Sequence, residues 1–243
     1  MATGLARTPD VRGPRFAIGA VLLIVNAVAY VVLEAVAAAA WRNPAYSYSY
    51  NYISDLGVPD TAEFQGRMID SPLHLVMNTA FVLHGVVFVI AAALLWPAVA
   101  RPGLRRAYLV LAVLHGVGIS LVGLFHGSQA AVDDGTAPLH GVGALLAIGA
   151  GNAAAIIAGS DLLRRRVRGL GAVLIAVGAT GIVAFASLLA NSGTAVDGIP
   201  ERIAVYAVMA AEAIAGIALL VARRRQRGAA STGPVPTTVG GQR

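Results

Sequence analysis

Six long apolar segments, separated by shorter polar connections, set the pattern of this chain. They cover about Phe16–Ala40, Ser71–Trp96, Arg106–His126, Pro138–Ser160, Gly169–Ala190 and Arg202–Val221. Each is long enough to cross the roughly 30 Å hydrocarbon core of a bilayer as a helix. Because a backbone in lipid must satisfy its own hydrogen bonds, and these segments lack the alternation of barrel strands, helices are favoured. The pattern predicts an all-α integral membrane protein with a six-helix transmembrane bundle.

Charge changes sign between successive connections. All 18 basic residues are arginines, and 15 of them lie in the two tails and in the second and fourth connections. The first, third and fifth connections hold eight of the 12 acidic residues but only Arg42, Arg67 and Arg202. Since arginine-rich short loops stay on the cytoplasmic side, both the N and C termini are predicted to be cytoplasmic. The net charge of +6 therefore reflects orientation in the membrane rather than nucleic-acid binding.

Composition divides the chain into three parts. We expect a cytoplasmic tail at 1–15, the transmembrane domain at 16–222 and a disordered, arginine-rich cytoplasmic tail at 223–243, whose end is rich in Gly and Pro. The first span could instead be a signal peptide, but its apolar stretch exceeds the usual core of about 7–15 residues, so a retained helix is favoured. The chain has no cysteine, which excludes disulfides and thiol chemistry.

The longest connection, 41–70, contains four alternating tyrosines in the sequence YSYSYNYISDLGVPD. We expect this outer loop to be ordered, and an extended conformation would put the four rings on one side as a partial lid over the bundle. A simpler interpretation, which we favour, is an anchor at the membrane surface. Ser54, Asp55 and Gly57 predict a tight turn. The functional alternative is a catalytic site at Asp55 and Ser54, with Asp55 as acid/base group or metal ligand.

Several motifs together resemble those of a known family. They are YNYISDLGVP, GLFHGS, DDGTAPLHGVGALLAIGAGNAAAI, RGLGAVLIAVGATG and IPERIAVY. In this order, over about 16–221, they resemble the bacterial and archaeal membrane proteins of domain-of-unknown-function family 998. The most specific matches are Ser54, Asp55, Gly57, the segment Asp133–Gly141, Asn152, Glu201 and Arg202. The resemblance implies a multi-pass architecture and supplies no catalytic mechanism.

Histidines and carboxylates at the predicted outer helix ends form a candidate metal site. His126 and His140 flank the connection that contains Asp133 and Asp134, and His74 begins the second span. Zinc takes three or four such ligands, and a catalytic zinc leaves one position to water. The alternative, which we favour, is interfacial histidines that bond to loops or water. Ser, Asp and His at an outer face also resemble the alkaline ceramidase and adiponectin receptor superfamily, although the last two helices here lack its paired histidines.

A deeper layer of polar groups lies inside the predicted spans. His84, His115 and Glu212 are near mid-span, Asn152 is a candidate partner, and Glu34 lies roughly two turns below the outer surface. Ionisable groups inside a membrane are costly and are therefore functional candidates. These could relay protons or hold a cation, as in coupled transporters. The alternative, which we favour, is that a protonated Glu212 bonds to His84 or His115 and joins the helices.

Three functions remain open. The first is an integral protein of the plasma membrane with an outward-facing polar His/Asp site of undefined biochemistry. The second is a metal-dependent, lipid hydrolase-like enzyme at the outer leaflet, with a divalent metal such as zinc as cofactor. The third is a small proton-coupled transporter. The expected partners are the lipid bilayer and either lipid headgroups or another membrane protein, with no nucleic acid. The use of arginine for every basic residue and the high alanine content indicate a bacterial source.

Overall fold

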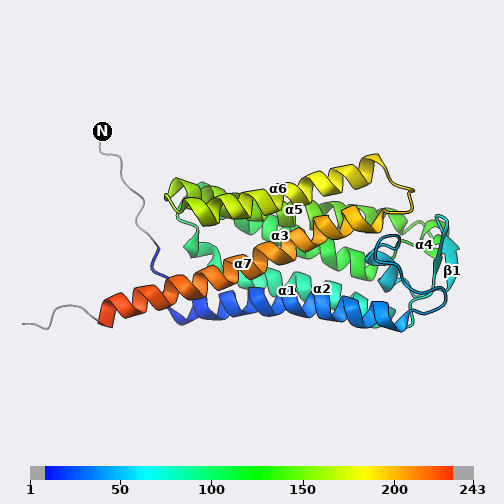
Figure 1. Cartoon of the computed structure of the whole chain (residues 1–243), viewed down its shortest axis with the longest axis horizontal. Coiled ribbons are helices and arrows are strands. Elements are labelled where there is room, and N and C mark those ends of the chain that lie inside the picture. Colours follow the sequence, from blue (N-terminus) through cyan, green and yellow to red (C-terminus); the bar gives the residue numbers. More distant parts are fainter. Residues whose placement is uncertain (1–8, 232–243) are drawn as a thin grey trace, which may run out of the picture.

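The structure is a computed structural model that describes residues 9–231, most of them helical. The six long helices are α1 (Pro14–Ala40), α2 (His74–Leu95), α3 (Pro102–Leu124), α5 (Ala137–Arg164), α6 (Arg168–Ala190) and α7 (Gly198–Ser231). They run along the long axis of the molecule (Figure 1). Six helices are long and apolar enough to cross a membrane, which confirms the predicted all-α, six-span architecture.

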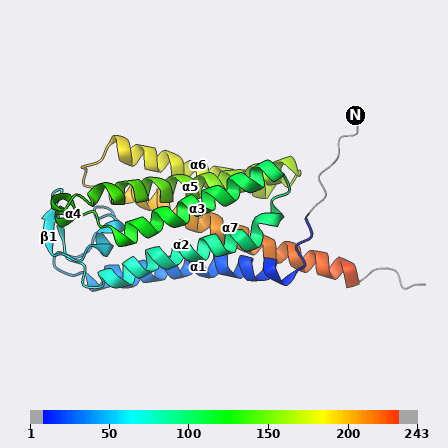
Figure 2. The same ribbon diagram turned by 180° about the vertical axis from the view of Figure 1, so that it is seen from behind.

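The six helices form a closed ring. α1 packs against α2, α2 against α3, α3 against α5, α5 against α6, α6 against α7, and α7 returns to α1. α5 also contacts α7 across the ring. Both ends of the described chain lie at one end of the bundle, and the first connection lies at the other with the helix α4 (Gln129–Asp133) (Figures 1 and 2). We call these the terminal end and the loop end.

The outward faces of the helices are aliphatic. Val25 is 55% exposed, Val183 is 68% exposed and Leu189 is 62% exposed. In water such a continuous apolar surface would promote association, whereas lipid tails match it. Together with the helix lengths, this surface makes the chain a membrane protein.

The arginine-rich segment after the last predicted span differs from our expectation. We expected disorder over 223–243, but α7 continues as far as Ser231 (Figure 1). Arg, Gln and Ala favour helix, so nothing in this segment ends α7. The side chain of Gln226 also ties it to the N-terminal segment, since it donates to the Pro9 carbonyl at 3.1 Å and accepts from the Val11 amide at 3.0 Å. The remaining parts of the two predicted tails, 1–8 and 232–243, lie outside the described residues.

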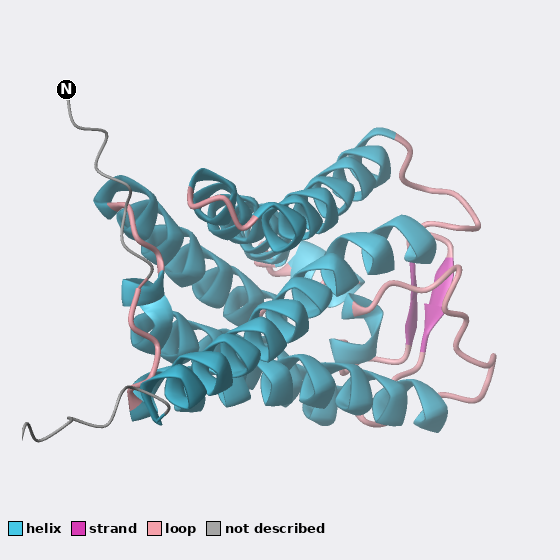
Figure 3. Cartoon of the chain, turned by 60° about the vertical axis from the view of Figure 1, so that its left-hand side comes forward, coloured by secondary structure: helices cyan, strands magenta, loops and turns pink. Residues whose placement is uncertain are grey.

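The loop end contains most of the short elements. The first connection holds the 3-10 helix η1 (Ser54–Gly57) and a hairpin of β1 (Ala62–Phe64) and β2 (Arg67–Ile69), as Figure 3 shows. The two strands are antiparallel, with Ala62 opposite Ile69. A second 3-10 helix, η2 (Trp96–Ala98), follows α2 at the terminal end.

The predicted extended conformation of the tyrosine segment is wrong. The backbone turns there, because the amides of Tyr50 and Asn51 both donate to the Ser47 carbonyl. The buried side chain of Asn51 accepts in return from the Ser47 amide at 3.0 Å and closes the turn. Such a local side-chain bond competes with an extended strand. The four tyrosine rings therefore do not share one side.

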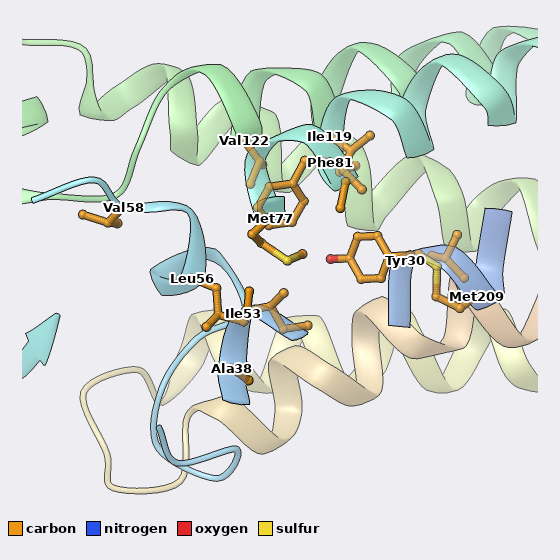
Figure 4. Close-up of a cluster of buried hydrophobic side chains, with 14 of the residues drawn as sticks. Tyr30, Ala38, Ile53, Leu56, Val58, Met77, Phe81, Ile119, Val122 and Met209 are labelled. Atoms are coloured by element: carbon orange, nitrogen blue, oxygen red, sulfur yellow. The ribbon is translucent and has the colours of Figure 1, made fainter. Parts of the chain in front are cut away.

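Apolar residues of the first connection insert between the helices. Ile53 and Leu56 are fully buried beside Tyr30 of α1 and Met77 and Phe81 of α2 (Figure 4). Burying each aliphatic side chain contributes about 1.5–3 kcal/mol. The loop is thus part of the core and holds its polar residues in place.

Glycine allows α3 and α5 to approach closely. A Cβ atom on Gly118 would lie 2.4 Å from the Ala147 backbone nitrogen, and one on Gly143 would lie 2.8 Å from the Gly118 carbonyl oxygen. Gly149, also on α5, has nothing within 4 Å of an added Cβ and offers a matched control. Small residues at such crossings let backbones pack directly.

We expect Gly118→Ala to destabilise the protein by about 1–3 kcal/mol, because the added methyl group must push α5 away. Thermal unfolding in detergent, followed by circular dichroism, should show a lower Tm. Gly149→Ala should leave the Tm equal to that of the wild type or slightly higher, since Ala favours helix. Equal Tm values for both variants would contradict this packing.

Candidate functional site

Buried charges and tyrosines join the first connection to the start of α7. Arg202 of α7 lies 3.4 Å from the carboxylate of Glu34 on α1. Its guanidinium also donates to the backbone carbonyls of Tyr48 and Asn51, each at 2.8 Å. The Tyr206 hydroxyl donates to Glu34 at 2.9 Å. We call this set, with the groups of the next two paragraphs, the loop-end network.

Asp55, predicted as a catalytic residue or a turn former, forms a buried ion pair. Arg67 of β2 approaches its carboxylate at 3.0 Å. The same carboxylate accepts from the Tyr52 amide at 3.0 Å, which closes the turn before η1. Ser54 lines a cavity that leads into the bundle. Asp55 therefore stabilises the loop, and a catalytic role for Asp55 and Ser54 stays a prediction.

Two further carboxylates anchor the loop to α7. Glu201 accepts from the Ile53 amide at 2.5 Å, and Asp197 accepts from the Tyr52 hydroxyl at 2.8 Å. Burial raises the pKa of Tyr52, and its bond to Asp197 raises it further, so the hydroxyl keeps its proton. Burial acts to raise the pKa of Asp197, but hydrogen bonds from Thr194, Gly193 and Tyr52 outweigh it and hold this pKa below its usual value. The contact therefore joins a neutral donor to a carboxylate.

The loop-end histidines predicted to bind metal have separate partners. The Asn78 amide donates to His126 Nε2 at 3.1 Å, and His140 Nδ1 donates to the Phe125 carbonyl at 2.9 Å. His74 Nδ1 donates to a backbone carbonyl three residues before it, at 3.1 Å. Burial, followed by the neighbouring His140, lowers the pKa of His126, so this ring is neutral at neutral pH.

The two predicted acidic ligands, Asp133 and Asp134, are exposed and stabilise turns around α4. Asp133 accepts from the Gln129 amide at 2.9 Å, and Asp134 accepts from the Thr136 hydroxyl at 2.6 Å. Within residues 9–231, three metal-binding side chains meet only elsewhere in the bundle. The structure thus does not gather the five residues around one point, and the loop-end metal site stays a prediction.

His84, His115 and Glu212 meet in the middle of the bundle. One ligand atom of each lies within 4.8 Å of the other two, and all three side chains are buried. His84 Nε2 lies 3.0 Å from Glu212 Oε1. The Asn26 side chain of α1 donates to Glu212 Oε2 at 3.1 Å. We call these four residues, from α1, α2, α3 and α7, the central cluster.

Several nitrogen and oxygen atoms of the central cluster lack hydrogen-bond partners. His115 Nδ1 donates to the Ala147 carbonyl at 2.7 Å, so its Nε2 carries a lone pair, and this atom has no described partner. His84 Nδ1 is also without a partner within the described residues, and Glu212 Oε1 is not aligned for a hydrogen bond with His84. Unpaired buried polar atoms are costly. A proton, a water or a metal ion would satisfy them.

Asn152 and Glu34, the other predicted intramembrane groups, lie outside this cluster. The Asn152 amide donates to the carbonyls of Ile148 at 2.9 Å and Ala204 at 3.0 Å, and so joins α5 to α7. Glu34 belongs to the loop-end network. Of the predicted intramembrane groups, His84, His115 and Glu212 therefore meet in one cluster. Asn26, which we did not predict as a partner, completes it.

Sequence reasoning missed three residues of these two networks. Asn26 is the only amide in the first span, which was a usable signal for a buried partner. Arg67 is one of two arginines in a loop with four acidic residues, which also pointed to an ion pair. Tyr206 gave no signal, because a tyrosine near a helix end is common in membrane proteins.

We expect Asp197→Asn to destabilise the protein at neutral pH, since an amide is a weaker acceptor for the three donors around it. The low folded-state pKa of Asp197 means that its stabilising effect is complete above the pKa of an unfolded Asp, about 3.9. The effect is lost as the pH falls through the lower folded-state value. The difference in Tm between variant and wild type should therefore shrink in acid.

The control is Asp10→Asn, measured by the same thermal unfolding in detergent. The pKa of Asp10 is also lowered, to about 2, by hydrogen bonds from Arg12, but this pair is exposed to solvent and should not alter the Tm. A Tm difference for Asp197→Asn that stays constant down to the lowest pH would contradict the ionised role of Asp197.

Comparison with known proteins gives one match. The model of the family described as "Protein of unknown function (DUF998)" matches residues 27–218, from the middle of α1 to just past the middle of α7. No curated protein and no solved structure matches the chain significantly. The matched region contains the loop-end network and, except for Asn26, the central cluster. Because the match spans well over half of its length, the chain belongs to the DUF998 family.

Proposed function

We propose that this protein is a small proton-coupled transporter in which His84, His115 and Glu212 carry the proton through the centre of the bundle. One observation carries the proposal: the central cluster lies between a cavity on its loop-end side and two cavities on its terminal side. Ionisable groups buried at mid-membrane depth are expensive, and proton relays are an established use of them.

The loop-end half of the route is a cavity of about 50 Å³. Ser54, Glu201 and His140 line it near the loop end, and His115 lines it at the cluster. One water molecule needs about 10–15 Å³ of such volume, so a short file of waters fits. Waters there would bring a proton to the free Nε2 of His115.

The terminal half consists of two adjoining cavities. The first, about 40 Å³, is lined by Glu212 and Tyr108. The second, about 210 Å³, shares Tyr108 with it and reaches Asp161 and Arg165 near the arginine-rich end of α5. A proton that leaves Glu212 thus has a path of water-sized spaces toward the terminal end.

The central cluster has the chemistry for the step between the two halves. His84 Nε2 and Glu212 Oε1 lie 3.0 Å apart, and a small rotation of either side chain would align them to share one proton that either group can hold. When His115 delivers a second proton to this pair, Glu212 releases one to the terminal cavity. The number of protons in the cluster is then restored.

The direction of transport depends on orientation. The terminal end carries the arginine-rich connections, so we infer that it faces the cytoplasm and that the loop end faces outward. The plasma membrane of a bacterium is the setting that fits this reading. The loop-end network would then close the outer side of the route, with Glu201 and His140 at its mouth.

Glu212→Gln should reduce proton flux at least tenfold, because an amide cannot accept the relayed proton. Flux is measured in proteoliposomes with an internal pH-sensitive dye after a potassium diffusion potential is imposed. The amide keeps the shape of the side chain, so size-exclusion profile and Tm should match the wild type. Glu63→Gln, on the exposed face of β1, is the control and should conduct normally. Equal flux in Glu212→Gln and wild type would exclude this relay.

Orientation can be tested directly because the chain has no cysteine. A single Glu63→Cys at the loop end should react with a membrane-impermeant maleimide in intact cells. Gly103→Cys, exposed at the terminal end, should react only after the membrane is permeabilised. The opposite labelling pattern would reverse the inferred direction of the route.

A further inference from the structure

We propose that the ion coupled to the proton is a divalent transition-metal ion, bound by His84, His115 and Glu212 in place of the shared proton. This inference rests on the proposed function for its role in transport, but the binding site stands on its own geometry. Two imidazoles and one carboxylate form a set of ligands that suits zinc and its neighbours in the periodic table. The chain would then exchange metal ions for protons.

The spacing of the three side chains is close to what a metal needs. Their ligand atoms lie within 4.8 Å of one another. Around a tetrahedral zinc, with bonds of about 2.0 Å, ligand atoms are separated by about 3.3 Å. Small rotations of the side chains close this gap. The three residues come from α2, α3 and α7, so a bound ion would join helices that lie on opposite sides of the ring.

The surrounding hydrogen bonds orient the ligand atoms toward the cluster. A metal-binding histidine usually donates its second ring N–H to a carbonyl or carboxylate, which fixes the tautomer. His115 does so through Nδ1 and the Ala147 carbonyl, and its Nε2 is left free. Glu212 is held in the same manner, because Asn26 binds Oε2 and leaves Oε1 for a ligand. If the cluster served only to join the helices, His115 Nε2 and Glu212 Oε1 would not need to be left without partners.

Neighbouring residues leave room for this arrangement. A Cβ atom on Gly151 would lie 2.7 Å from His115 Nδ1, so a glycine there preserves the position of the ring. The Phe88 ring packs against His115 with ring centres 4.6 Å apart and limits its rotation. The loop-end cavity reaches His115 and can supply a water as fourth ligand. The cavities on both sides also provide entry.

Binding must release a proton for charge and atoms to balance. Before binding, the His84–Glu212 pair holds one mobile proton and both histidines are otherwise neutral. The metal ion takes Glu212 as a carboxylate and each histidine through a lone pair, so that proton leaves through an adjoining cavity. No bond other than the metal–ligand bonds forms, and nothing is oxidised or reduced. One proton should therefore be released for each metal ion bound.

The test is equilibrium dialysis of detergent-purified protein against Zn²⁺, together with proton release measured in weak buffer with a pH indicator. We expect one Zn²⁺ per chain and about one proton released. Glu212→Gln and His115→Gln should each weaken binding more than a hundredfold. Asn26→Ala, which only removes the hydrogen bond that orients Glu212, should weaken it about 10- to 100-fold. Unchanged Tm values without metal show that these variants are folded.

The matched control is the double variant His74→Gln, His126→Gln at the loop end, because neither residue lines the cavity that leads to His115. It should bind Zn²⁺ as tightly as the wild type. If this variant loses the metal while Glu212→Gln retains it, the ion belongs to the loop-end histidines and the proposal is overturned. Absence of stoichiometric Zn²⁺ binding in the wild type would also overturn it.

The outcomes separate this inference from the proposed function. Proton flux without metal binding would leave the relay and remove the metal site. Metal binding by the central cluster without proton flux would establish the site and reject the transporter. If both metal binding and proton flux are observed, Zn²⁺ that leaves the proteoliposomes should drive protons inward. Glu212→Gln should abolish this proton movement.

Discussion

Arg202 is the residue on which the loop end depends. Its guanidinium faces Glu34 of α1, the hydroxyl of Tyr46 and the backbone carbonyls of the first connection and of α7 itself. A buried cation is tolerable only when a carboxylate and several acceptors surround it. These groups come from α1, from the loop that follows it and from α7 about 150 residues later, so satisfying one charge joins all three. The same contact closes the ring of helices.

The central cluster differs from the surroundings of Arg202 in its charges and in its hydrogen-bond partners. It holds one carboxylate and two imidazoles, and the described structure pairs none of them with an arginine. Both Nη atoms of Arg202 donate to described acceptors, whereas His115 Nε2 and His84 Nδ1 have no described partner. A network with many hydrogen bonds between distant segments favours a rigid structure, and ring nitrogens without partners leave capacity for a mobile ion. Because of this difference, we assign a structural role to the loop-end network and a role in transport to the central cluster.

Packing connects the two networks. Ile53 and Leu56 insert from the loop into the core, and Tyr30, beneath them, has its ring centre 5.2 Å from that of His84. The loop-end cavity runs beside these residues from Glu201 to His115. A movement of the loop away from α7 would therefore widen the cavity. In the route that we propose, the first connection therefore lies at the entrance on its side of the bundle.

The sequence alone determined the six helices and predicted a mid-membrane depth for His84, His115 and Glu212, because helix rise and bilayer thickness relate position in a span to depth. It also indicated the DUF998 family through its motifs. It did not determine which side chains face each other, since this depends on helix rotation and on glycine contacts such as Gly118 with α5. Only the tertiary structure therefore paired Asn26 with Glu212, Arg67 with Asp55 and Arg202 with Glu34. Only the tertiary structure also shows that the tyrosine segment turns, because the hydrogen bond of the Asn51 side chain outweighs the preference of alternating residues for an extended strand.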